Sequence, residues 1–234
     1  MKGLFRYPEK AKFGQIIPKA KIYEHAKLKP AQKAQFVDLI QQIRWAHKLA
    51  PETTNLSTTD DVREIQILRI RITQRNLPDD ILRIIDSAIP STVIFELIYE
   101  GQTQVKAAHK QRKTEGSTRS SLSSYFASGW MDEDANRSDL PQALNLGILY
   151  DKILSELINP DAPKHGEVMT SLADKVAHQE DIKAKEAEIA KIGQKLRRTK
   201  QFNKKQEINS TLKKAKSDLE ILKKNFKKPQ EAHR

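Results

Sequence analysis

The last third of the sequence carries two runs of apolar residues whose spacing is typical of helices that pack side by side. The first run consists of Ile182, Ile189, Ile192 and Leu196, and the second of Ile208, Leu212, Ala215, Leu219, Leu222 and Phe226. The first run is the weaker one, because Lys185 takes the position that its apolar stripe skips. The runs are out of phase, since the first would continue at Thr199 and Asn203. The pattern predicts two helices over residues 171–228 that form an antiparallel, coiled-coil-like hairpin. One long, self-associating helix is the alternative.

The stretch between the two runs is strongly basic. No acidic residue occurs from Ile189 to Gln206, and six cations cluster around the break between the runs: Lys195, Arg197, Arg198, Lys200, Lys204 and Lys205. In a hairpin they would lie at its tip, together with Phe202. Such cations neutralise phosphates without selecting a base, and an exposed aromatic ring can stack on a base or dock on a protein. The alternative is a solvated turn whose lysines only improve solubility.

Charge and composition limit the classes of partner and site. The net charge of +12 is uneven, because residues 1–50 carry 11 basic and 3 acidic side chains, whereas residues 51–100 carry 5 and 9. Basic ends around an acidic centre favour a polyanionic partner, most simply nucleic acid, although a solvated lysine-rich surface has the same composition. The absence of cysteine excludes disulfides and thiolate metal sites. The sequence begins without the apolar stretch of a secretion signal and has no apolar run of membrane-spanning length, so we expect a cytoplasmic protein without a membrane partner.

The remaining segments predict an α+β fold, a small antiparallel sheet with packed helices, over residues 1–158. We expect short extended pieces at 16–19 and 22–23, a helix over 30–44, an extended segment over 45–51, a strand over 63–73, a helix over 79–89, strands over 93–99 and 103–109, a loop over 113–124 and a helix over 144–158. Two prolines and polar neighbours predict a linker over 159–170, and a tail follows the hairpin at 229–234. In the first strand the apolar positions change faces at Leu68, which predicts a bulge or burial on both faces.

Several of these segments resemble an uncharacterised bacterial family, one of the domains of unknown function. The matching residues are Ile17-Pro18-Lys19, Ile22-Tyr23, Ile43 to Thr53 (IRWAHKLAPET), Glu64-Ile65-Gln66-Ile67, Ile89-Pro90, Ile94-Phe95-Glu96-Leu97, Trp130 and Gln201 to Lys205 (QFNKK). None of these motifs is a catalytic signature. Members of this family are often encoded beside DNA methyltransferases and helicases of restriction-like defence loci. The resemblance therefore implies a role in DNA-targeting defence.

The one enzymatic hypothesis that the sequence supports is a metal-dependent nuclease. Such enzymes place an acid on one strand and an acid or amide followed two residues later by lysine on the next, and Glu96 precedes Gln104 and Lys106 across a predicted hairpin. The turn decides whether they meet. A two-residue Glu100-Gly101 turn pairs Glu96 with Val105 and leaves Lys106 on the opposite face, whereas a three-residue loop places Glu96 opposite Lys106. In the second case a cross-strand salt bridge is the simpler explanation.

Other chemistry receives no support from the sequence. The six histidines are scattered, without metal-ligand spacing, and neither glycine-rich phosphate-binding motif occurs, so we expect no metal site and no cofactor. Trp45 and Trp130 are expected in the core or packed on the sheet edge rather than stacked on bases.

Together these observations favour a non-enzymatic accessory subunit of a DNA-acting bacterial complex, and the family resemblance implies that this complex is a restriction-like antiphage system. The partner would be a larger helicase or DNA methyltransferase, and the basic tip would contact protein or DNA. The two alternatives are the nuclease around Glu96 and Lys106, and a structural protein that associates through one long helix.

Overall fold

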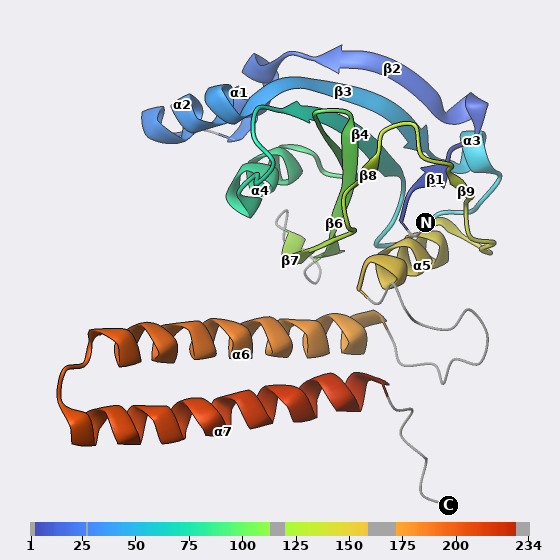
Figure 1. The fold of residues 1–234 in the computed structure, drawn as a ribbon. Coiled ribbons are helices and arrows are strands. Elements are labelled where there is room, and N and C mark those ends of the chain that lie inside the picture. Colours follow the sequence, from blue (N-terminus) through green and yellow to red (C-terminus); the bar gives the residue numbers. More distant parts are fainter. Residues whose placement is uncertain (1–2, 27, 113–119, 159–171, 228–234) are drawn as a thin grey trace, which may run out of the picture. The chain divides into compact units, whose positions relative to one another are not determined.

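The computed structural model describes residues 3–26, 28–112, 120–158 and 172–227. Contacts divide the chain into two units, residues 1–162 and 163–234, each described by itself below. The elements are β1 (Phe5–Arg6), the 3-10 helix η1 (Glu9–Ala11), β2 (Lys12–Ile17), α1 (Lys19–Ala26), α2 (Pro30–Leu39), β3 (Ile40–Leu49), α3 (Pro51–Thr54), β4 (Ile65–Ile72), α4 (Asp79–Ala88), β5 (Thr92–Tyr99), β6 (Gln102–Arg112), β7 (Ser120–Ala127), β8 (Met131–Asp132), β9 (Ser138–Asp139), α5 (Leu146–Ile158), α6 (Leu172–Arg198) and α7 (Phe202–Lys227) (Figure 1).

The first unit is built on one curved, seven-stranded sheet (Figure 1). Its strands follow the order β2-β3-β4-β5-β6-β7, and β8 pairs with β6. All neighbouring pairs are antiparallel except β4 and β5, which are parallel. The α+β class is confirmed, and the sheet is mostly antiparallel, but it is larger than the small antiparallel sheet expected and is mixed because of the parallel β4–β5 pair. Helix α4 lies between β4 and β5 and returns the chain to the end where β4 began, which makes the two strands parallel.

Helices α1, α2 and α4 cover one face of this sheet. The core on this face includes Ile22, Phe36, Leu39, Leu68, Ile70, Ile72, Ile81, Leu82, Ile85, Val93, Phe95 and Leu97, all buried. Two acids in the first turn of α4, Asp79 and Asp80, favour the helix N-terminus there, as the sequence predicts. Lys110 of β6 donates to the Asp86 and Ile89 carbonyl oxygens at the other end of the helix, so a cation meets the negative end of its dipole.

Helix α5 lies over strands β6 and β7 and begins at Leu146, where the Asn145 side chain accepts the Ile148 N–H at 2.8 Å. Leu149 and Ile153 are fully buried, and the Tyr150 hydroxyl donates to the Ala108 carbonyl of β6. The N-terminal strand β1 pairs in parallel with β9, so that Phe5 lies opposite Ser138. Phe5 is 1% exposed, which anchors this early segment in the core.

Strand β4 is buried on both faces around Leu68, as the change of face in its sequence predicts. The β5–β6 pairing decides between the two turn lengths that the sequence leaves open, because Tyr99 pairs with Gln102 and the turn therefore has two residues. Both turn residues have positive φ, 45° at Glu100 and 74° at Gly101, which is the backbone that matches the twist of the flanking strands.

The expected helix over 30–44 ends at Leu39, and strand β3 begins at Ile40. The residues of β3 that are most buried recur every third position, at Ile40, Ile43, Ala46 and Leu49. Register shifts between Ile40 and Gln42 and between Trp45 and His47 reset the alternation of the strand. The bulges therefore give this strand a period close to that of a helix, which explains the wrong prediction.

Two further boundaries differ from the sequence-based expectation. Ile22 and Tyr23 belong to helix α1 instead of an extended piece, and residues 120–124 of the expected loop form the first part of β7. Residues 113–119, the expected linker over 159–170 and the tail over 229–234 lie outside the described residues.

The second unit consists of helices α6 and α7, which lie side by side and are separated by residues 199–201 (Figure 1). The chain thus forms two helices here rather than one long helix. Neither these helices nor any other described helix is long and apolar enough to cross a membrane.

Candidate functional site

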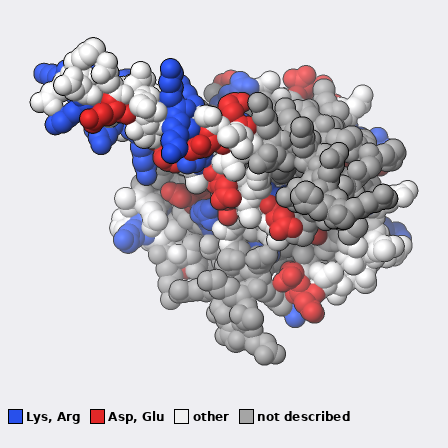
Figure 2. Space-filling model, turned by 90° about the horizontal axis from the view of Figure 1, so that it is seen from below, with Lys and Arg blue, Asp and Glu red and all other residues white. Residues whose placement is uncertain are grey.

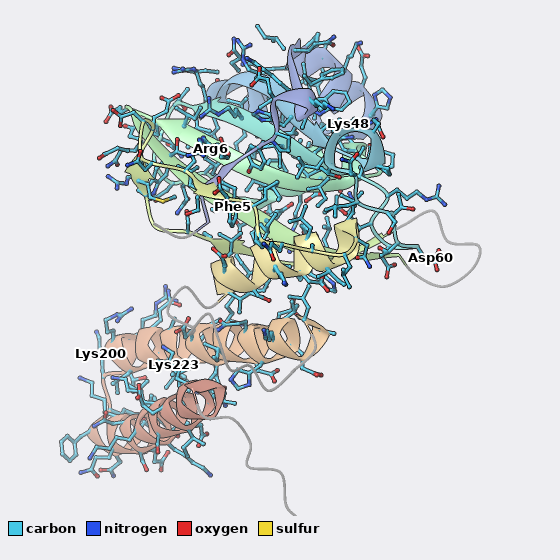
Figure 3. All side chains as sticks on the ribbon, turned by 90° about the vertical axis from the view of Figure 1, so that its right-hand side faces the viewer. Phe5, Arg6, Lys48, Asp60, Lys200 and Lys223 are labelled. Atoms are coloured by element: carbon cyan, nitrogen blue, oxygen red, sulfur yellow. The ribbon has the colours of Figure 1, made fainter. Side chains whose placement is uncertain are left out.

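The two C-terminal helices meet through apolar side chains and ion pairs. Ile182 of α6 and Ala215 of α7 are buried at 6% and 4% exposure, as expected for members of the two apolar runs. Lys223 pairs with Glu186 at 2.8 Å, and Figure 3 labels Lys223 between the two ribbons. His178 Nε2 lies 3.0 Å from the Leu222 carbonyl oxygen, so the start of α6 lies beside the end of α7.

The connection between the helices is short and contains neither glycine nor proline. Helix α6 ends at Arg198, and the next residue, Thr199, donates both its backbone N–H and its hydroxyl to the Lys195 carbonyl oxygen. Helix α7 opens at Phe202, with the Lys205 N–H donating to the Gln201 carbonyl oxygen at 3.0 Å. The apolar stripe of α6 also ends here, at Leu196. A longer α6 would gain no further apolar packing, and such packing is what mainly stabilises a helix.

We call the six predicted cations of this connection, with Phe202, the basic tip. All six are exposed: Lys195, Arg197, Arg198, Lys200, Lys204 and Lys205. Within the described part of the chain none of them forms an ion pair, whereas Lys185 and Lys223 along the helices pair with Glu188 and Glu186 at 2.8 Å each. Figure 3 labels Lys200 at the joined end of the helices, and Figure 2 shows blue and red side chains mixed over the helices at its upper left.

The first turn of α7 places charge against the helix dipole. It contains no acidic residue, and Lys204 and Lys205 lie in it instead. A cation beside the positive end of a helix is unfavourable by a few tenths to about 1 kcal/mol. Phe202, at the start of the same turn, is 72% exposed. The arrangement costs stability and leaves both the charges and the ring accessible to a partner.

The structure does not assemble the nuclease constellation. Glu96 pairs with Val105 in the β5–β6 register, so Lys106, opposite Phe95, lies on the other face of the sheet. Lys106 instead forms an ion pair with Asp79 of α4 at 2.9 Å, and the Gln104 amide donates to the Ser128 carbonyl oxygen at 3.0 Å. The described residues contain no cluster of three or more His, Cys, Asp or Glu side chains that could hold a metal ion.

Glu96 is instead the centre of a buried polar cluster. It is 1% exposed, and its carboxylate accepts from Arg69 Nε at 2.9 Å and from both Arg137 terminal nitrogens at 2.8 and 2.9 Å. Burial opposes ionisation of Glu96, but the Arg137 and Arg69 guanidiniums outweigh it and hold the pKa of this carboxyl below its usual value. Arg137 also donates to the Phe5 carbonyl oxygen at 2.9 Å, which ties the β1 segment to the sheet.

Two aromatic side chains border this cluster. The rings of Tyr7 and His47 lie 4.8 Å apart, and burial raises the pKa of Tyr7 and lowers the pKa of His47. The Tyr7 hydroxyl lies near Glu96 without reaching hydrogen-bond geometry. Sequence reasoning placed Glu96 in a candidate site but missed its partners. Arg69 could have been singled out, because it is a charged residue within an isoleucine-rich strand. Arg137 could not, because it lies in a polar loop with no distinguishing pattern.

Trp45 and Trp130 are both partly buried against the sheet core, as expected. Trp45 lies against Phe13 of β2 with ring centroids 4.1 Å apart, and Trp130 lies 6.5 Å from Tyr99.

Comparison with known proteins identifies the family. No curated protein and no solved structure matches the chain. The sequence pattern of the family described as "Domain of unknown function (DUF4391)" matches residues 5–219, which includes the sheet, α6 and most of α7. The match covers far more than half of the 234 residues. The chain therefore belongs to the DUF4391 family of domains of unknown function.

Proposed function

We propose that this protein is a non-enzymatic accessory subunit of a cytoplasmic, DNA-acting bacterial complex, and that α6 and α7 form a coiled-coil-like hairpin whose basic tip contacts the DNA backbone. The observation that carries the proposal is the contrast within one helical unit. Lys185 and Lys223 along the helices pair with Glu188 and Glu186, whereas the six exposed cations of the basic tip lie in a stretch without an acidic residue, Ile189 to Gln206, and have no ion pair among the described residues.

Phosphate contacts account for this contrast. A tip that engages phosphates through all six cations would give log K against log salt a slope of about −5 on duplex DNA, because each contact contributes about −0.9. Such contacts carry no sequence information, so binding is non-specific. Phe202 adds an apolar ring that stacks on an unpaired base or inserts into a protein surface.

A helicase or DNA methyltransferase of a restriction-like antiphage system is the proposed partner. This part of the proposal rests on the resemblance to a family whose members are often encoded beside such enzymes.

The DNA contact is tested by reversing three charges of the tip. The variant Lys200→Glu, Lys204→Glu, Lys205→Glu is compared with Lys213→Glu, Lys214→Glu, Lys216→Glu, whose three lysines are also exposed but lie in the middle of α7. Both variants change the net charge equally. Fluorescence anisotropy with a labelled duplex, over a series of salt concentrations, should show that the tip variant loses about three units of salt slope and the control much less. Equal losses in both variants would mean that only net charge matters and would refute a tip contact.

The partner is tested by affinity purification from the native host. Full-length protein is compared with a chain ending at Thr170, which lacks α6 and α7. A helicase or methyltransferase that co-purifies only with the full-length chain would place its docking on the helical unit, and retention by the shorter chain would place docking on residues 1–162. Recovery of neither enzyme with either chain would refute the accessory role.

A further inference from the structure

A row of side chains crosses the sheet on the face of Glu96. Arg44 of β3 lies directly opposite Arg69 of β4, and Arg69 lies directly opposite Glu96 of β5. Arg71 points to the same face, two residues along β4. Like charges directly opposite each other on neighbouring strands are destabilising, so the Arg44–Arg69 pair needs a reason.

The guanidinium of each arginine on this face contacts at least one acceptor through some of its N–H groups. Its other N–H groups are available to a ligand. Arg44 donates to the Gly14 carbonyl oxygen at 2.9 Å, Arg69 and Arg137 donate to Glu96, and Arg71 lies 3.8 Å from Glu133. The Arg71 side chain is 54% exposed, Arg69 30% and Arg137 21%. A guanidinium has five donors in a fixed plane, and the bonds to Glu96 fix the orientation of two of these groups in advance.

The charges on this face do not balance. Four arginines, Arg44, Arg69, Arg71 and Arg137, meet three carboxylates, Glu96, Glu133 and Glu100, the last of which lines the pocket beside Arg71, so one positive charge is in excess. Burial also favours the neutral form of the neighbouring His47 by lowering its pKa. Partly buried positive charge without a counter-charge is costly, and a bound anion would remove the excess.

Two buried polar atoms border Glu96. Among the described residues His47 Nδ1 makes no hydrogen bond, and the Tyr7 hydroxyl, although Tyr7 is only 8% exposed, lies near Glu96 without reaching hydrogen-bond geometry. Buried polar atoms are paired in most proteins, and exceptions often mark a bound water, ion or ligand. Arg71 also lines a surface pocket of about 260 Å³ at the carboxyl ends of β4 and β5, where Thr73 and Tyr99 lie.

We propose that this face of the sheet binds a dianionic phosphate group. A single arginine guanidinium can bind phosphate through two parallel N–H groups. A phosphate has enough oxygens to accept from more than one guanidinium. Its negative charge compensates the local excess of positive charge, and the pocket beside Arg71 receives what the phosphate is attached to. The phosphate comes from a free nucleotide or inorganic phosphate, or from the 5′ end of a DNA strand. This site lies within residues 1–162 and is independent of the basic tip.

The experiment measures phosphate binding to the full chain by isothermal titration calorimetry, with sodium chloride held at constant ionic strength. The test variant is Arg44→Gln, Arg71→Gln, which keeps Glu96 and both of its arginine partners. The control is Arg63→Gln, an exposed arginine two residues before β4. Wild type and control should bind inorganic phosphate saturably and with equal affinity, and the test variant should bind at least about tenfold more weakly.

A structural role for the arginines would give a different result. It predicts that the test variant unfolds more easily and that phosphate stabilises wild type no more than chloride does. If this face is a phosphate site, the test variant should unfold less easily than wild type at low salt in the absence of phosphate. The reason is that Arg44→Gln removes the unfavourable Arg44–Arg69 pair. No saturable phosphate binding by wild type, or an equal loss in Arg63→Gln, would overturn the proposal.

A further experiment distinguishes a free phosphate from the 5′ end of a DNA strand as the ligand. It uses the tip variant described above, so that DNA binding by the tip does not interfere. Adenosine monophosphate is compared with a single-stranded oligonucleotide that carries either a 5′-phosphate or a 5′-hydroxyl. Preference for the phosphorylated oligonucleotide over the nucleotide identifies a DNA end as the ligand, and equal or weaker binding of the oligonucleotide identifies a free phosphate. Binding of the hydroxyl form as tightly as the phosphorylated form would contradict a phosphate site.

Discussion

Reversing the two lysines in the first turn of α7 should stabilise the helical unit while it weakens DNA binding. Lys204 and Lys205 are exposed, form no ion pair among the described residues and lie near the positive end of the helix dipole. Each lysine costs about 0.3–1 kcal/mol there, and glutamate at the same position gains a similar amount. Salt and full exposure reduce both effects, so we expect a total gain of about 1–2 kcal/mol for Lys204→Glu, Lys205→Glu at low salt.

The assay follows this gain in the full-length chain. Amide hydrogen exchange of α7 reports the stability of this helix locally, and a gain of 1 kcal/mol in a unit of this size corresponds to about 4–8 °C in melting temperature. The matched control, Lys213→Glu, Lys214→Glu, makes the same charge change in the middle of α7, where the dipole has no effect. Slower exchange in both variants would point to net charge, and faster exchange in the tip variant would refute the dipole argument.

Three further predictions concern the sheet. Glu96→Gln should lower the free energy of unfolding at pH 7 by about 3 kcal/mol, because Arg137 and Arg69 lose their buried counter-charge. Since the folded pKa of Glu96 is lowered, its contribution is fully present above its unfolded pKa of about 4.3 and is lost as pH falls through the folded pKa, so urea titrations of wild type and variant should converge in acid. Glu100→Asn should stabilise the hairpin by up to about 1 kcal/mol in thermal melts, because asparagine tolerates the positive φ of 45°; a loss would refute the turn assignment. Lys110→Met should destabilise the domain by about 3–5 kcal/mol in urea, because it leaves the buried Asp86 carboxylate without its ion pair at 3.0 Å, and an unchanged midpoint would contradict this.

The sequence predicts the elements that carry a strong local signal. Strand β4, helix α4 and the β5–β6 turn follow from apolar spacing, from acids at a helix start and from a Glu-Gly pair. The sequence predicts the extended second half of β3 but assigns residues 40–44 to a helix, because the two bulges change the period of two into a period of three. Bulges are set by pairing with β2 and β4, which a single sequence does not display.

The candidate sites differ in the same way. The basic tip is continuous in sequence, so its charge is visible without a structure. The Glu96 cluster is assembled from β1, β3, β4, β5 and the loop before β9, and Arg137 lies 41 residues from Glu96 along the chain. Composition and spacing give no sign of such contacts, because they are made by the order of the strands and not by any motif.

The pairing of β1 with β9 has a consequence for the order in which the protein is made. Phe5 and Ser138 are neighbours in space, and the Arg6–Asp139 ion pair beside them spans 133 residues of chain. At about 5–20 residues per second, the ribosome needs roughly 7–27 s after Arg6 to deliver Asp139. During that interval Leu4 and Phe5, both buried in the finished domain, have no partner strand. The nascent chain therefore exposes its first core residues until nearly the whole sheet has been synthesised, and this segment is where a chaperone would bind.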